Sequence, residues 1–219
     1  MSENGRGRAE QFQRPRPRIQ SLSDLIFGLA LSIGALNLIA SKPPDTAALL
    51  GNIASFGFSF LVLILVWFRY TEIMSVLPVE TTRTRALNTI MLFLVAIEPY
   101  LFNQLSFGLN TVAFSTLSQN DASAVYALDI GAIWAILASF SHILSSEERN
   151  LVAPDLLRKY RLFRNLELIV GGLFFVSILP PFWTYAIGGT NLRYVLWLLS
   201  FFVRRGGNLY SRAALKQRH

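Results

Sequence analysis

Apolar stretches long enough to cross a lipid bilayer constrain the fold of this chain more than any other feature. The 219 residues are 53% hydrophobic and only 15% charged, with a mean hydropathy of +0.43. A helix that spans the hydrocarbon core needs about 20 apolar residues. We therefore expect an all-α membrane protein with six transmembrane helices, at residues 22–40, 47–68, 86–107, 123–143, 163–181 and 191–203.

The positions of the basic residues predict the orientation of these spans. Of the 20 lysine and arginine residues, only two lie at the connections after the first, third and fifth spans: Lys42, and Arg193 at the border between the fifth connection and the sixth span. Cytoplasmic connections carry the excess of Lys and Arg in membrane proteins, so both termini should be cytoplasmic. This topology also explains the net charge of +7, which in a soluble protein would suggest a nucleic-acid partner. We expect the lipid bilayer, and no nucleic acid, as partner.

Composition divides the chain into three parts. Residues 1–17 are rich in Arg, Gln and Pro and read as a disordered basic cytoplasmic arm. Residues 18–204 should form the six-helix transmembrane domain, and residues 205–219 a basic cytoplasmic tail. The arginines of the arm act either as a topology signal, which is the interpretation we favour, or as an attraction to anionic lipid headgroups.

The sequence lacks the residues and motifs that most enzymes need. It has no cysteine and only two histidines, His142 and His219. Gly-x-Ser-x-Gly, Walker and His-Glu-x-x-His motifs are absent from it. We expect no enzymatic activity, no metal site and no cofactor, and we interpret His142 as a packing or interface residue.

Four carboxylates fall in or near the predicted spans, where a charge costs a few kcal/mol or more and usually faces protein or water. Asp24 and Glu167 lie near the cytoplasmic ends of their spans, whereas Glu98 and Asp129 lie in the outer half. Because their depths differ, we do not expect a shared metal cage. A proton relay of the kind found in secondary transporters stays open as an alternative.

The first span carries a stripe of branched aliphatic side chains. At 100° per residue, Leu29, Ile33 and Leu36 lie within about 60° of one another, and Ser32 lies about 60° from Leu29 on one flank. The pattern alone fits a core or lipid-facing surface better than a pore. Asp24 should find its partner on another helix, and Trp67, Tyr70 and Asn88 lie at the matching predicted depth.

The start of the first span resembles a known signature. Arg18-Ile-Gln-Ser-Leu22-Ser23-Asp24 is similar to the Arg-x-x-x-Phe-Ser-Asp motif of the transmembrane protein 175 family, whose members form potassium-permeable channels. Trp67-Phe-Arg-Tyr70 resembles the family's second-helix Trp-x-x-His, and Asn88 before Leu92-Phe-Leu resembles its third helix. Leu22 and Tyr70 depart from the family pattern, and tyrosine does not titrate near neutral pH as histidine does.

The resemblance implies the prokaryotic six-helix form, a homotetramer with one pore lined by the first helix. It places the narrowest point at Leu29 and further pore-facing turns at Ile33 and Leu36, and it implicates Ser32 in potassium preference. It also implies a polar network that positions the first helix, formed by Arg18, Ser23, Asp24, Trp67, Tyr70 and Asn88.

We therefore expect a potassium-preferring cation channel in a prokaryotic plasma membrane, with K⁺ as the permeant ion. Its selectivity should be modest because the chain has no Thr-Val-Gly-Tyr-Gly filter, for which Val170-Gly171-Gly172 is no substitute. The alternative is a proton- or cation-coupled secondary transporter that uses Glu98 or Asp129.

Overall fold

The computed structural model describes residues 18–40, 42–77, 81–105, 118–147, 151–187 and 190–203. Its elements are, in order, α2 (Arg18–Ala40), α3 (Thr46–Met74), α4 (Thr82–Asn103), α5 (Gln119–Leu144), α6 (Pro154–Ser177), α7 (Pro180–Thr184), β1 (Ala186–Ile187) and β2 (Thr190–Asn191). A last helix follows at Leu192–Val203. The two short strands pair antiparallel. The predicted arm, residues 1–17, and the predicted tail, residues 205–219, lie outside the described residues.

Three of the long helices begin at a polar residue that caps them. The side chains of Asp45, Thr81 and Ser118 accept hydrogen bonds from backbone N–H groups three residues further along, at the starts of α3, α4 and α5. Each of these bonds satisfies a donor that the first helical turn leaves without a partner. The caps therefore fix where each helix leaves its connection.

The first four predicted spans correspond to helices that are long and apolar enough to cross a membrane, at Ser21–Ala40, Thr46–Met74, Thr82–Asn103 and Gln119–Leu144. Pro99 lies inside α4, and the helix continues past it to Asn103. The membrane-spanning character of the fold is therefore carried by α2 to α5 within the described residues.

The two C-terminal spans differ from the prediction. The span predicted at residues 163–181 is interrupted, because α6 ends at Ser177 and α7 begins at Pro180. Pro180 and Pro181 have no backbone N–H to continue the ladder of α6. The last helix, Leu192–Val203, is shorter than a single straight span requires. The count of six transmembrane helices therefore stays a prediction.

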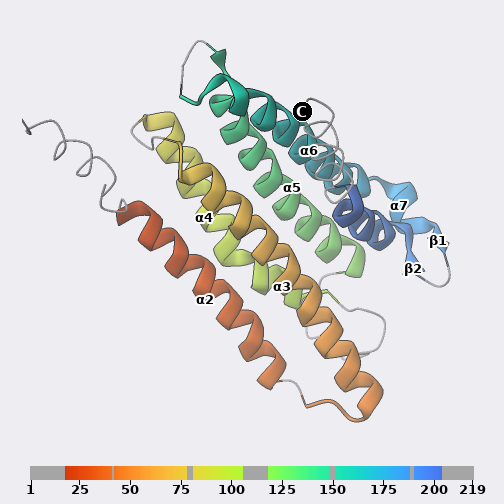
Figure 1. The fold of residues 1–219 in the computed structure, drawn as a ribbon. Coiled ribbons are helices and arrows are strands. Elements are labelled where there is room, and N and C mark those ends of the chain that lie inside the picture. Colours follow the sequence, from red (N-terminus) through yellow and green to blue (C-terminus); the bar gives the residue numbers. More distant parts are fainter. Residues whose placement is uncertain are drawn as a thin grey trace, which may run out of the picture.

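The helices lie side by side in an order that leaves α2 at one edge (Figure 1). It packs on α3 and α4, whereas α5 lies between α4 and α6 at the centre of the core. Small residues let α5 and α6 approach closely: a Cβ added at Gly171 would lie 3.2 Å from the carbonyl oxygen of Gly131. The Val170-Gly171-Gly172 segment thus serves the packing of α6 on α5. Helix α2, at the edge, has one face without a neighbour from its own chain.

Candidate functional site

Helix α2 has one face packed in the bundle and one face that nothing in its own chain covers. Ser23, Phe27 and Ala30 are almost completely buried on the packed side. The other side carries a continuous row of aliphatic side chains that are between 44% and 77% exposed: Leu22, Leu25, Leu29, Ile33, Leu36 and Ile39. We call this row the aliphatic stripe. It contains the three residues predicted to narrow a pore, and it continues beyond them toward both ends of the helix.

Ser32 lies beside the aliphatic stripe and is exposed. Its hydroxyl donates a hydrogen bond of 2.8 Å to the carbonyl oxygen of Gly28, one turn earlier. Such a bond uses the only proton of the hydroxyl but leaves its oxygen able to accept. The Ser32 oxygen can therefore still contact a cation or water outside the helix.

Polar contacts anchor the first half of α2 to the bundle. The indole Nε1 of Trp67 donates to Asp24 Oδ1 at 3.0 Å, and Tyr70 donates its O–H to Asn88 Oδ1 at 2.7 Å. The Ser23 hydroxyl lies 2.6 Å from the Tyr70 oxygen. Because Tyr70 gives its single proton to Asn88, Ser23 is the donor in this contact.

The structure thus brings together the predicted network residues of three helices. Tyr70, at the position where the family has histidine, lies between Ser23 of α2 and Asn88 of α4. Asp24 is exposed in the single chain and contacts α3 through Trp67. The backbone of Arg18 begins α2, but its side chain lies outside the described residues.

The Tyr70 link gives a stability prediction. Tyr70→Phe should lower the free energy of unfolding by about 1–3 kcal/mol, because it leaves two buried polar side chains, Ser23 and Asn88, without this partner. Unfolding of the purified protein in detergent measures the change. Tyr100→Phe is the matched control, since Tyr100 is 65% exposed. Equal losses in the two variants would contradict a role for the Tyr70 hydroxyl.

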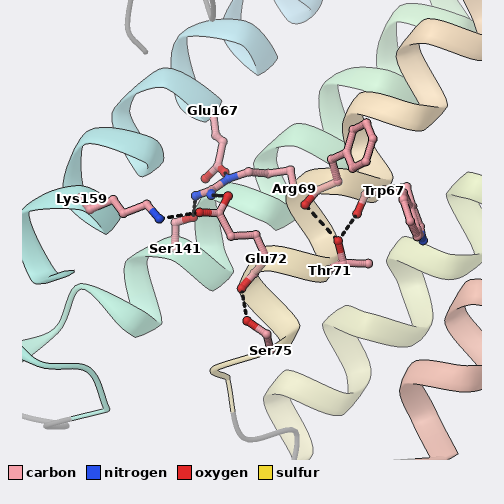
Figure 2. Close-up of polar contacts among 9 residues, drawn as sticks. Trp67, Arg69, Thr71, Glu72, Ser75, Ser141, Lys159 and Glu167 are labelled. Carbon is pink, nitrogen blue, oxygen red and sulfur yellow. Dashed lines mark hydrogen bonds and ion pairs between the residues drawn. The ribbon is translucent and has the colours of Figure 1, made fainter. Parts of the chain in front are cut away.

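A second polar cluster, which the sequence did not predict, joins α3 to α5 and α6 (Figure 2). Buried Arg69 donates through Nε to Glu167, through Nη1 to Glu72 at 2.6 Å and through Nη2 to Ser141 at 3.2 Å. Lys159 adds a 2.8 Å ion pair to Glu72. We call these five residues the Arg69 cluster.

The two polar groups share α3 as their scaffold. Trp67 and Arg69 point to opposite sides of this helix in Figure 2, the first toward α2 and α4 and the second toward α5 and α6. From the sequence, Arg69 is interpreted as a cytoplasmic charge and as part of an interface anchor at the end of the second span. Its place inside an apolar helix, directly after Trp67-Phe68, was the signal that it has a buried partner.

The remaining intramembrane carboxylates lie elsewhere. Glu98 is fully buried and accepts hydrogen bonds from Ser59, at 3.0 and 3.1 Å, and from Tyr126, at 3.1 Å. Asp129 is also buried. Within the part of the chain that the structure describes, no group of three or more His, Asp and Glu side chains could hold a metal ion. His142 is exposed and contacts Arg164, with 3.4 Å between Nδ1 and Nη1.

Comparison with known proteins agrees with this architecture. Residues 18–99 match the model of the family described as endosomal/lysosomal potassium channel TMEM175. A crystal structure of a lysosomal potassium-selective channel TMEM175 homolog from Chamaesiphon minutus superposes with a TM-score of 0.56 and 20% identity, over 87% of this chain and 97% of that one. A crystal structure of a threonine-to-alanine variant of the potassium channel MtTMEM175, in complex with a nanobody–MBP fusion, superposes with a TM-score of 0.59 and 18% identity, over 94% of this chain and 96% of that one. No curated protein shows a significant match.

The fold and the site define a multi-pass, all-helical membrane protein. The family match confirms the predicted resemblance to the transmembrane protein 175 family. It runs from the start of α2 to Pro99 of α4. The matched family and both solved structures are named as potassium channels, and none of them is named as an enzyme.

Proposed function

We propose that the chain is the subunit of a homotetrameric, potassium-preferring cation channel in a prokaryotic plasma membrane, with both termini cytoplasmic. The observation that carries this proposal is the aliphatic stripe of α2, which stays uncovered while polar contacts hold the opposite face. A lipid-facing helix would show the same exposure. The match to potassium channels through the same segment favours the central axis instead.

In this arrangement four copies of α2 surround the ion path. Leu29, Ile33 and Leu36 from each subunit form successive hydrophobic rings. A narrow ring of aliphatic side chains disfavours water, and without water an ion cannot pass. Small movements of α2 that widen or narrow these rings would then control conduction. The Trp67–Asp24 and Ser23–Tyr70–Asn88 contacts set the resting position of the helix.

Ser32 supports a modest potassium preference. Its exposed hydroxyl oxygen can accept a direct or water-mediated contact from an ion that sheds part of its hydration shell. Four copies around the axis multiply a small preference. Since the Ser32 proton is bonded to Gly28, the oxygen lone pairs are the part that can face the ion.

Ser32→Ala should therefore lower the potassium-over-sodium permeability ratio and leave conduction intact. A loss of about 0.5–1 kcal/mol in differential stabilisation lowers the ratio roughly two- to fivefold. Reversal potentials under bi-ionic conditions measure it. Ser139→Ala is the matched control, because Ser139 on α5 also bonds back to a carbonyl one turn earlier, that of Ala135 at 2.8 Å. A wild-type reversal potential in Ser32→Ala would remove the selectivity role.

Purified protein in liposomes tests the channel proposal as a whole. A channel carries potassium down its gradient without a counter-substrate or a proton gradient. The alternative, a coupled secondary transporter, is favoured by the burial of Glu98 and Asp129 inside the bundle. Potassium flux that requires an opposing proton or sodium gradient, at a low turnover per protein, would select the transporter over the channel.

A further inference from the structure

Asp129 is a buried acid without a visible counter-group. It lies near the middle of α5 and is 4% exposed. Neither of its carboxylate oxygens has a hydrogen-bond partner among the described residues. An ionised carboxylate buried without partners is so costly that it is normally neutralised. The site therefore needs either a cation or a proton.

Glu98 is a second buried carboxylate on the helix that packs against α5. Glu98 of α4 is fully buried and accepts a hydrogen bond from Tyr126, which lies three residues before Asp129 on α5 and therefore on the same face of that helix. The hydroxyls of Ser59 and Tyr126 donate to Glu98, so its negative charge is stabilised where it stands. Two carboxylates that share one buried site do not both ionise readily, because like charges repel. Asp129, which lacks donors, is the one that should be neutral.

No basic side chain in the described residues neutralises the pair. Arg69 is paired with Glu167 and contacts α5 at Ser141, which lies 12 residues beyond Asp129 along the helix, roughly 18 Å away at 1.5 Å per residue. On the α6 side, Phe175 lies against Gly131.

Arg193 at the start of the last helix also reaches α5, but its guanidinium is held by other groups. Arg193 is bound by the carbonyls of Asn120, Ser177 and Ile178 and by the hydroxyl of Ser123. The further titratable groups on this side are the phenols of Tyr126 and Tyr194. The described surroundings of Asp129 thus hold acids and phenols but no available base.

We propose that Asp129 binds a proton in the folded protein and forms, with Glu98, a buried proton-binding site inside each subunit. This site lies among α3, α4 and α5 and is separate from the aliphatic stripe of α2. A proton needs a single oxygen, whereas a hard metal cation such as Ca²⁺ takes about six to eight oxygen ligands. The described part of the chain has no cluster of three acids or histidines that would approach that number.

The site makes the packing of α4 on α5 depend on pH. When the proton leaves at alkaline pH, two negative charges stay buried together. Below that pH the folded protein keeps a proton that the solvated carboxyl of the unfolded chain has already lost, so the free energy of unfolding falls as the pH rises. This follows from the fold of one subunit and holds whether or not the protein conducts ions.

Infrared difference spectroscopy of the purified protein, combined with thermal unfolding across pH, tests the proposal. Wild type should show the carbonyl band of a protonated, buried carboxyl at neutral pH, and its unfolding temperature should fall at alkaline pH. Asp129→Asn should lose the band and most of the alkaline decrease. Asp121→Asn, an exposed aspartate on the same helix, should keep both. A band of unchanged intensity in Asp129→Asn would overturn the assignment.

Two further measurements test the proposal if Asp129→Asn does not fold, or if a metal cation and not a proton neutralises the site. Glu98→Gln removes the neighbouring charge, so the band should disappear at a lower pH than in wild type, because Asp129 then loses its proton more readily. An unchanged titration in this variant would contradict the pair. A saturable rise of the wild-type unfolding temperature with sodium chloride but not choline chloride, with no carboxyl band at any pH, would identify a metal cation and refute the proton.

Discussion

Leu29→Asn should increase the single-channel conductance or the background leak of the reconstituted protein. In the proposed tetramer, four leucine side chains at the axis would create a dewetting barrier, and an amide at the same place would support water. A barrier lowered by about 1–2 kcal/mol raises the current roughly five- to thirtyfold. Planar-bilayer recordings at matched protein density measure the effect.

The control for this prediction is a leucine of the same exposure on another helix. Leu61 on α3 is 52% exposed and Leu29 is 53% exposed, but only Leu29 belongs to the aliphatic stripe. Leu61→Asn should therefore leave the current unchanged. A Leu29→Asn variant that expresses and assembles normally with wild-type current would show that the constriction lies elsewhere.

The absence of cysteine allows a direct test of the same position. Because the chain has no native thiol, Leu29→Cys and Leu61→Cys each introduce a single reactive group. In the proposed arrangement, a water-soluble thiol reagent should change the current of the first variant, whose thiol would face the ion path, and not of the second, whose thiol would face lipid. Block of both or of neither variant would contradict the placement of α2 at the axis.

The sequence predicted the first four spans because their signal is simple. Each is an apolar run of sufficient length. The prediction of the fifth span was wrong at the end of α6, for a reason that hydropathy does not show. Ile178 and Leu179 are as apolar as the helix before them, but the backbone leaves the helix there, ahead of two prolines. The short pair of strands that follows gave no periodic signal at all.

Contacts within the site were predictable only where depth and motif agreed. Asp24 lies near the start of α2 and Trp67 near the end of α3, so the antiparallel order of these neighbouring helices predicted the two at the same depth. Arg69 and Glu167 are far apart in the sequence, and no motif or spacing in either segment predicts that the two side chains form a pair. Arg193 was likewise treated as a loop charge, yet its guanidinium binds the carbonyls of Ser177 and Ile178, where α6 ends.

Arg69→Met should destabilise the folded protein more than any other single change in the Arg69 cluster. Methionine keeps the volume of the stem, but Glu167, 3% exposed, stays buried without the guanidinium. Removing one partner of a buried ion pair costs about 3–5 kcal/mol. Denaturant titration of the purified protein in detergent micelles measures the free energy of unfolding.

The double variant separates the buried charge from the loss of packing. Replacing both partners of a buried pair by apolar side chains is often neutral or stabilising, so Arg69→Met with Glu167→Leu should recover most of the lost stability. Lys159→Met removes only the 46%-exposed partner of Glu72 and should cost at most about 1 kcal/mol. If the double variant is no more stable than Arg69→Met alone, the bonds of Arg69 to Glu72 and Ser141, and not the Glu167 charge, hold α3 against α5 and α6.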